Sequence, residues 1–420
     1  MPELRTAGRS LPSWLQLSNA GVVYAFCVLV AVLSVATAMS GRPSYVSPNN
    51  ISNVMDQAAL LGIIAVTTTI VLISGNFDLS VGSVAALGAA TCLVLMPSLG
   101  FWGAFVAALL VGAGVGLFNG VVVQYIGINA FIVTLGTMTA VRGLVLILTD
   151  GRTITAETGA ARDSLRALDA SRWVTPNLYL IAGVALLLWG AWRWWSTRRA
   201  GRPVTQLNVL VPLGAGVLLV ALSPVLILTI ELSQRAIYML VIVAVAAWVL
   251  RFTTIGRRLY ATGGNAEAAR LSGIAVNRYR VVPFVLNGVA AAFVGVLYAS
   301  RLTSINPTGL NGFELTALAA AILGGTSLFG GLGSVVKSLI GALILITLAN
   351  GFNILNLGAN YQGLIQGVVL IVAAGMYTIA LRRRQRVKLR TVAPAPNDRP
   401  SGSAAEREAD LVATGSSEQR

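Results

Sequence analysis

Apolar runs of about twenty residues recur along this chain of 420 residues. A run of that length can cross the hydrocarbon core of a bilayer as an α-helix. About twelve such runs begin near residues 22, 51, 79, 101, 130, 177, 207, 235, 281, 313, 335 and 360. The runs at 177, 235 and 313 are short, so the predicted number of spans is about ten to twelve. The sequence therefore predicts an all-α polytopic membrane protein.

The composition agrees with this class. Hydrophobic residues make up 56% of the chain and charged residues 11%, and the mean hydropathy is +0.78. A soluble domain has about 25% charged residues, so a soluble fold is disfavoured. The predicted surroundings are membrane lipid in a multi-pass arrangement. The formal charge of +15 could also suggest nucleic acid, but the arginines lie in loops and in the tail, which favours membrane topology instead.

The distribution of charge predicts which loops face the cytoplasm. Arginines are concentrated in the stretches 193–202, 251–280 and 382–390, whereas the loop 150–176 balances four arginines against four acidic residues. Positive charge marks the cytoplasmic side of a membrane protein. With an even number of spans, both termini are therefore expected in the cytoplasm.

Three regions follow from this pattern. Residues 1–21 are predicted to be a cytoplasmic N-terminal segment. Residues 22–381 form the transmembrane region, with a cytoplasmic loop at 251–280. Residues 382–420 are predicted to be a cytoplasmic tail, first basic and then disordered, because its last part is rich in Pro, Ser, Ala, Glu and Arg.

Residues that commonly carry catalysis are scarce. The chain has no histidine, which excludes histidine relays, histidine metal sites and Ser/His/Asp triads. Cys27 and Cys92 both lie in apolar runs and are interpreted as packing residues. No carboxylate pair or nucleophile–base set is recognisable. We therefore expect no catalytic residue, no metal site and no cofactor, and the chain is not expected to be an enzyme.

The stretch Gly256–Arg280 is a polar island between two apolar runs. Within it, Asn265 can cap a short helix, Glu267 suits the positive N-terminal end of that helix, and Gly273 can end it. A short helix is thus predicted over Asn265–Ser272. Such a helix on a cytoplasmic loop could be moved by a soluble partner.

Two further polar interruptions are candidates for function. In Ser74–Ser83 (SGNFDLSVGS), Asp78 either caps the following helix or has a role in a transport path or partner interface. The Gly-rich segment Glu314–Ser334 lacks the Gly-Lys-Ser/Thr ending of a phosphate loop, which favours a broken helix or hinge. The candidates for a path or hinge are Asp78, Ser80, Gly82, Gly324, Gly325, Thr326, Gly330 and Gly331.

Several polar side chains lie inside predicted spans. They either face the bundle interior or a water-filled path, or form hydrogen bonds between helices, and the sequence leaves both possibilities open. The residues concerned are Gln57, Arg142, Asn287, Gln362 and Gln366. The acidic residues Asp56, Asp78, Glu231 and Glu314 lie near predicted span ends, where coupling to an ion gradient is less easily explained.

A weak internal repeat is also visible. Asn119-Gly120, Gly127 and Asn129 recur as Asn350-Gly351, Gly358 and Asn360, an offset of 350 − 119 = 231 residues. The same offset relates Gly136 and Gly367. Because the two Asn-Gly pairs fall at opposite ends of their predicted spans, the pattern suggests an inverted repeat of the kind found in transporters.

Three motifs resemble those of a known family. GGNAEAARLSGI (Gly263–Ile274), DLSVGS (Asp78–Ser83) and LGGTSLFGGLGS (Leu323–Ser334) are similar to motifs of the permease subunits of bacterial sugar ABC importers. The resemblance covers Val46–Arg384 and is strongest to xylose-transport permeases, within the ribose, arabinose and galactose group. Like these, the chain has three apolar segments, 177–192, 207–230 and 235–250, where shorter members have one. Gly75-Asn76-Phe77 departs from the family pattern, whereas Asp78 matches it.

The resemblance implies a role for the polar island. It implies that the island contacts a cytoplasmic ATPase subunit, with Ala268, Ala269 and Leu271 as a small apolar knob beside Arg270. The residues implied in this contact are Gly264, Asn265, Glu267, Ala268, Ala269, Arg270, Leu271 and Gly273.

The resemblance also implies partners and cargo. The expected partners are two ATPase subunits, an extracytoplasmic sugar-binding protein and a second permease copy. The expected cargo is a monosaccharide, first xylose or another pentose, carried across the inner membrane without an ATPase site in this chain. The alternatives are a stand-alone secondary transporter and the same machinery with another cargo.

Overall fold

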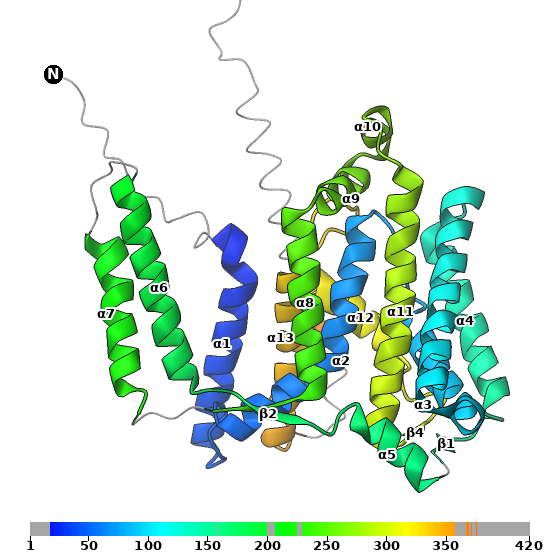
Figure 1. Cartoon of the computed structure of the whole chain (residues 1–420), viewed down its shortest axis with the longest axis horizontal. Helices are drawn as coiled ribbons and strands as arrows, with labels where there is room; N and C mark the ends of the chain where they lie inside the picture. The colour runs from blue at the N-terminus through cyan, green and yellow to red at the C-terminus, as the bar shows by residue number, and fades with distance from the viewer. Residues whose placement is uncertain are drawn as a thin grey trace, which may run out of the picture. The chain divides into compact units, whose positions relative to one another are not determined.

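The structure is a computed structural model that describes residues 17–156, 158–199, 206–224 and 229–357, together with the single residues 367, 368, 371 and 375. The chain divides into two compact units after Leu370. All that follows concerns the first unit. Its elements are α1 Leu17–Met39, α2 Pro48–Ile73, α3 Val81–Val121, the π-helical η1 Val122–Ile126, α4 Ala130–Leu148, β1 Ile154–Thr155, α5 Gly159–Ala167, β2 Arg172–Val174, α6 Leu178–Arg199, α7 Gln206–Leu222, β3 Glu231–Ser233, α8 Gln234–Phe252, α9 Thr254–Gly264, α10 Ala266–Leu271, α11 Val276–Leu302, β4 Ser304–Ile305, α12 Phe313–Leu323 and α13 Val335–Ile354 (Figure 1).

Long apolar helices dominate the described residues. Eight stretches are long and apolar enough to cross a membrane, and α7 and α12 are shorter apolar helices. α3 is broken at Gly100, whose φ of 68° is not helical, so it contains two helical parts. Each of the first eleven predicted segments is thus a helix or a part of one. The twelfth, near residue 360, lies outside the described residues. The all-α, multi-pass class is confirmed.

Small residues let α11 pack closely along α3. A methyl group added to Gly288 would overlap the carbonyl oxygen of Gly112, and one added to Gly116 would overlap that of Phe284. Backbones in contact in this way are typical of helices that associate in lipid. α2 in turn packs against α8, α11, α12 and α13, so it lies inside the bundle and is largely buried.

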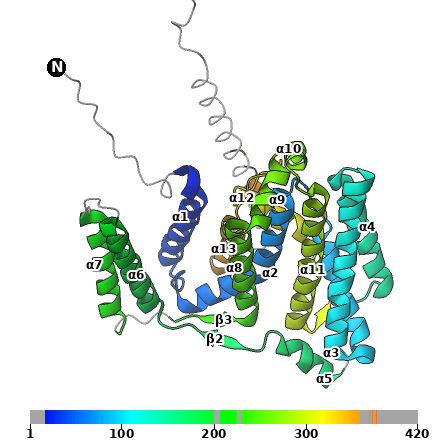
Figure 2. The same ribbon diagram turned by 45° about the horizontal axis from the view of Figure 1, so that its top comes forward.

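Two short β-ladders lie at the end of the bundle that contains α5. β1 pairs antiparallel with β4 (Figure 1). β2 pairs antiparallel with β3 (Figure 2), and Trp173 lies opposite Leu232 in this ladder. α9 and α10 lie at the opposite end in both views (Figures 1 and 2). α6 and α7 pack against each other through Gly183, Gly190 and Gly216. These two helices correspond to the two apolar segments that the chain has in excess of the shorter family members.

The 231-residue offset relates whole elements. Subtracting 231 from the bounds of α11 gives 45–71, close to α2, and subtracting it from α13 gives 104–123, close to the second part of α3. α12 maps onto 82–92, within the first part of α3. α2 runs from the β-ladder end to the α9 end, whereas α11 runs the opposite way, since Tyr279 lies near Arg258 of α9 and Leu302 precedes β4.

Candidate functional site

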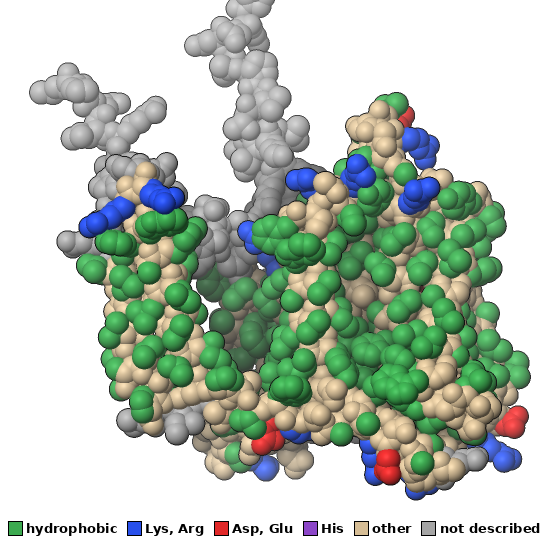
Figure 3. All heavy atoms as spheres, viewed as in Figure 1, with side chains coloured by type: hydrophobic (Ala, Val, Ile, Leu, Met, Phe, Trp, Pro, Cys, Tyr) green, Lys and Arg blue, Asp and Glu red, His purple; other side chains and the backbone are tan. Residues whose placement is uncertain are grey.

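The end of the bundle that contains α9 and α10 is basic. Arginine side chains gather there above an apolar belt (Figure 3). The stretch 251–280 contributes Arg251, Arg257, Arg258, Arg270, Arg278 and Arg280, with Glu267 as its one acidic residue. We call this the basic end.

The helix predicted from the capping pattern is present as α10. The Asn265 side chain accepts a hydrogen bond from the Ala268 backbone N–H at 3.0 Å. Glu267 lies in the first turn, where it favours the helix dipole, and Arg270 lies in the last turn. Gly273 ends the helix with a φ of +77°, a conformation that glycine adopts without strain. The predicted helix is therefore confirmed, although its bounds are Ala266–Leu271.

The exposed face of α10 differs from the predicted one. Ala268 is exposed and the Leu271 side chain is 86% exposed, but Ala269 is buried, with 4% of its surface accessible. The Ala269 carbonyl accepts a hydrogen bond from the Ile274 N–H as the chain turns back towards α11. Ala269 therefore packs against its own chain, and the prediction that it belongs to an outward apolar knob is wrong. Ala268 and Leu271 remain as the available apolar surface.

Two of the three motifs meet at the base of α10, together with the residues that precede the third. Gly263, at the end of α9, lies against the backbone of Ile73, at the end of α2, and against that of Gly331. A methyl group added to Gly263 would overlap the Ile73 carbonyl. The Gly331 N–H donates to that same carbonyl at 2.9 Å. A methyl group on Gly330 would lie 2.7 Å from Gly75 and from the Gly263 carbonyl. We call Gly75, Gly263, Gly330 and Gly331 the glycine junction.

A tyrosine hydroxyl fastens α9 to the same loop. Tyr260 donates to the Gly333 carbonyl at 2.9 Å. Partial burial raises the pKa of Tyr260 above its ordinary value, because the ionised phenolate would lose hydration. The hydroxyl therefore stays protonated and able to donate. α9 and α10 are thus held to the α2–α3 and α12–α13 connections together.

A chain of buried hydrogen bonds begins at the α2–α3 connection. Asp78 Oδ1 accepts from the Ser80 N–H at 3.0 Å and from the Ser80 hydroxyl at 2.6 Å. Asp78 Oδ2 accepts from the Asn287 amide of α11 at 2.9 Å. Ser80 Oγ accepts from the Asn119 amide at 3.0 Å, which joins the connection to the second part of α3.

Two threonines end this chain, which we call the Asp78 network. Thr67 of α2 donates to Asn287 Oδ1 at 2.7 Å, and Thr137 of α4 donates to Asn119 Oδ1 at 2.6 Å. All six side chains are buried, none with more than 8% of its surface accessible. The network therefore ties α2, α3, α4 and α11 together at one place.

Asp78 lies next to the start of α3 without being its N-cap. The N-cap is Ser80, whose side chain makes no capping bond within the helix. Asp78 accepts from the N-cap residue and from α11. Asn287 likewise bonds between helices, which is one of the two roles that the sequence left open for it.

The other predicted residues divide into four groups. Gly82 packs against Glu314 at the start of α12, and Glu314 forms an ion pair with Arg142 of α4 at 3.6 Å. Gly324 and Thr326 pack against Ser338 of α13, with Thr326 Oγ1 3.2 Å from the Ser338 hydroxyl oxygen. Gly325 has a φ of +81° and lies in the turn that ends α12. Gln57 is partly buried in α2, and Gln362 and Gln366 lie outside the described residues.

A second buried cluster lies at the β-ladder end, and the sequence reading missed it. Arg235 of α8 is 1% exposed and bonds to both carboxylate oxygens of Asp56 at 3.0 and 2.9 Å. Its Nε lies 2.8 Å from Asp169 Oδ2. An arginine inside the apolar run at 235 was a usable signal, because a buried cation needs a carboxylate. Among the described residues, no group of three Cys, Asp or Glu is arranged to hold a metal ion.

The relative burial of Thr137 and Thr139, both in α4, allows a matched test. Replacing Thr137 with valine keeps the shape but leaves Asn119 Oδ1 without its donor, so we expect a loss of about 0.6–1.7 kcal/mol of stability. Thr139 is exposed and bonds only to the Leu135 carbonyl of its own helix, so Thr139→Val should change little. Thermal unfolding of the purified protein in detergent measures both. Equal losses of stability in the two variants would mean that the hydrogen bond from Thr137 to Asn119 does not stabilise the fold.

Comparison with known proteins places these features in a family. The chain is 33% identical over 392 residues to the xylose transport system permease protein of Escherichia coli K12, covering 88% of this chain and 95% of the relative. It is 34% identical over 351 residues to the ribose import permease protein of the same organism, covering 83% of this chain and 90% of the relative. For the ribose import permease protein of Haemophilus influenzae the identity is 35% over 350 residues, with the same coverage.

The family assignment rests on most of the chain. No solved structure matches it significantly. Residues 50–374 match the family described as the branched-chain amino acid transport system / permease component. That range contains the glycine junction, α10 and the Asp78 network. This chain belongs to that family of multi-pass membrane permeases.

Proposed function

We propose that this chain is the membrane-spanning permease of a binding-protein-dependent ABC importer that carries a monosaccharide across the inner membrane. The sugar is suggested by the relatives, which are xylose and ribose permeases. The observation that carries the proposal is α10, a capped and exposed helix seated on the glycine junction at the basic end. ATP is bound and hydrolysed by separate cytoplasmic ATPase subunits, and this chain contributes no catalytic residue.

The basic end faces the cytoplasm in this proposal. Positive charge supports that orientation, with both termini on the same side and about ten to twelve spans. Residues 22–381 then form the permease domain, 251–280 the coupling loop, and 1–21 and 382–420 the cytoplasmic ends. A second copy of the chain and an extracytoplasmic sugar-binding protein complete the importer.

Movement enters the chain through α10. The contact residues are those of the predicted coupling set without Ala269, whose side chain is buried. A displacement of α10 passes to α9 and, through the glycine junction, to the connections that begin α3 and α13. Closure of the ATPase subunits would thereby favour one of two arrangements of the bundle, because they bind the two arrangements with different affinity.

The candidate path or hinge residues act as a joint in this proposal. Asp78, Ser80 and Thr326 are each less than 6% exposed, and their polar atoms bond to other helices or to neighbouring turns. A water-filled path would expose such groups. In this role the buried bonds of Asp78, Ser80 and Thr326 hold the α2–α3 and α12–α13 connections to the neighbouring helices while the helices move.

The 231-residue correspondence supports an inverted repeat. α2 and α11 run in opposite directions and each precedes an irregular connection and a second apolar helix. Inverted repeats of this kind provide two equivalent halves that can rock between outward- and inward-facing states.

For the cargo, xylose or another pentose is the first choice. The alignment with the xylose permease covers more of both chains than that with the ribose permease, and α6–α7 accounts for the added segments. The alternatives are the same machinery with another cargo and a secondary transporter that works alone.

The docking role of α10 has a direct test. Ala268→Asp places a charge on the exposed face, and docking into an apolar groove would bury it without a partner. We expect the affinity of the cognate ATPase subunit for the permease to fall by more than about tenfold. Co-purification and titration in detergent measure the loss.

The matched control is Ala160→Asp, on the exposed surface of α5 at the other end of the bundle. It should leave ATPase binding unchanged. Ala269→Asp is unsuitable, because it would bury a charge inside the permease itself. Undiminished binding by Ala268→Asp would mean that another surface receives the ATPase.

A further inference from the structure

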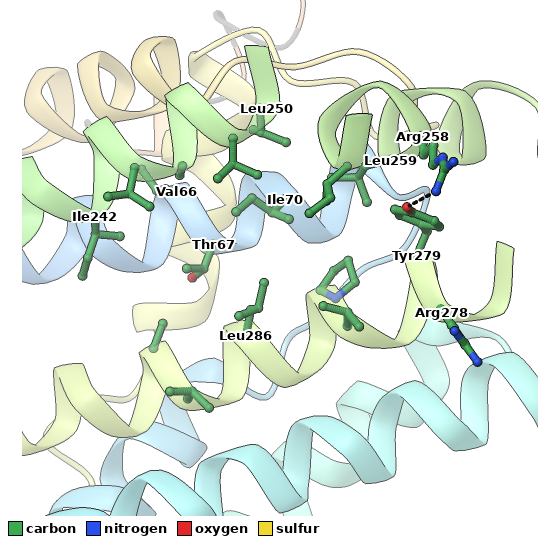
Figure 4. A pocket seen from close by; sticks show the side chains of 18 of the residues that line it. Val66, Thr67, Ile70, Ile242, Leu250, Arg258, Leu259, Arg278, Tyr279 and Leu286 are labelled. Atoms are coloured by element: carbon green, nitrogen blue, oxygen red, sulfur yellow. Dashed lines mark hydrogen bonds between the residues drawn. The ribbon is translucent and has the colours of Figure 1, made fainter. Parts of the chain in front are cut away.

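An apolar groove opens beside α2. α8 and α11 both pack on α2. Between α8 and α11 lies a cavity of about 850 Å³ that is also lined by residues of α2. Val66, Thr67 and Ile70 of α2 form its floor, while the walls are formed by α8 between Val241 and Leu250 and by α11 between Val282 and Phe293 (Figure 4). The side chains along both walls are almost all aliphatic, which disfavours a sugar as the occupant.

The groove has one aromatic end and one cationic end. At the aromatic end Phe293 of α11 packs against Tyr238 of α8, with ring centroids 5.7 Å apart. Arg258 and Arg278 lie at the other end, where Arg258 Nη1 is 3.4 Å from the Tyr279 hydroxyl (Figure 4). Both arginines are exposed, and neither takes part in an ion pair within the described residues.

The length of the groove suits one leaflet of a bilayer. Phe293 lies fourteen positions after Tyr279 in α11, and at about 1.5 Å per position the two residues are about 21 Å apart along the helix. One half of the hydrocarbon core measures about 15 Å. A groove that starts at the basic end therefore passes from headgroup level into the acyl-chain region.

We propose that this groove binds an anionic glycerophospholipid, with its acyl chains along Val245, Leu286 and Phe293 and its phosphate at the cationic end, where Arg258 and Arg278 lie. The charge is complementary, because the stretch 251–280 has six arginines and one acidic residue. Basic pockets between membrane helices at the interface select anionic headgroups in this way. The bound lipid would fill the space between α8 and α11 beside Thr67 of the Asp78 network.

The test uses the full chain in vesicles of equal parts phosphatidylglycerol and phosphatidylcholine, followed by native mass spectrometry. The unmodified permease should retain phosphatidylglycerol in preference. The double variant Arg258→Gln/Arg278→Gln should lower that preference on the order of ten- to thirtyfold. Arg42→Gln/Arg152→Gln removes two exposed arginines elsewhere and should leave it unchanged.

A second variant fills the groove without altering charge. Ala246→Phe places a ring between the walls and should also release phosphatidylglycerol, while size-exclusion chromatography reports whether the protein stays folded. Equal retention of the two lipids, or a preference that survives the double arginine variant, would overturn the proposal. Dissociation of a permease dimer by Ala246→Phe, with lipid retained, would overturn it too and assign the groove to a second copy of the chain.

Discussion

Replacing Arg235 with alanine is expected to destabilise the folded permease by about 3–5 kcal/mol. Arg235 is 1% exposed, so its removal leaves the carboxylates of Asp56 and Asp169 in a largely buried site without their main cation. Asp56 belongs to α2, Arg235 to α8 and Asp169 to the segment before β2. We therefore expect the contact between α2, α8 and the β-ladder end to loosen, with a lower unfolding temperature in detergent.

Arg172→Ala is the matched control for this variant. Arg172 also faces Asp56, but at 3.8 Å and with a side chain that is 47% exposed. Exposed ion pairs contribute about 0–1 kcal/mol, so this change should be small. If both variants unfolded at the temperature of the unmodified protein, the buried cluster would have no stabilising role.

Replacing Gly263 with alanine is expected to reduce ATP-driven uptake on the order of tenfold and to destabilise the protein by about 1–3 kcal/mol. The added methyl group would overlap the Ile73 carbonyl and lie 2.7 Å from the Gly331 nitrogen. The hydrogen bond from Gly331 to Ile73 would have to break, and α9 would move away from α2. Uptake by reconstituted permease and thermal unfolding measure the two effects.

The neighbouring Gly264 provides a control in the same sequence context. A methyl group there would have Gly331 Cα as its nearest neighbour, at 3.9 Å, which is an ordinary contact. Gly264→Ala should therefore stay within about 0.5 kcal/mol of the unmodified protein. Equal losses of thermal stability in the two variants would show that the close contact of Gly263 with Ile73 and Gly331 does not hold α9 in place.

Local patterns predicted much of this molecule. The apolar runs predicted the helices because a backbone in lipid must satisfy its own hydrogen bonds. α10 was predictable because its capping residues are neighbours in sequence. The side of α10 that faces inwards could not be predicted, because the burial of Ala269 depends on how the chain turns back at Ile274.

Contacts between distant segments left no local signal. Asp78 and Asn287 are 209 residues apart, and nothing near either residue identifies the other as its partner. Gly263 and Gly264 are alike in sequence, yet only the packing of α2 and the α12–α13 connection makes one of them sterically restricted. Arg235 could have been recognised as needing a carboxylate, but the choice of Asp56 and Asp169 depends on the fold.

The most direct test of the central claim is uptake by proteoliposomes that contain this permease, its ATPase subunits inside and its binding protein outside. We predict that labelled xylose enters only when ATP, the ATPase subunits and the binding protein are all present, and that Ala268→Asp abolishes this uptake. Entry of sugar through the permease alone, driven by an ion gradient and unaffected by ATP, would contradict the account.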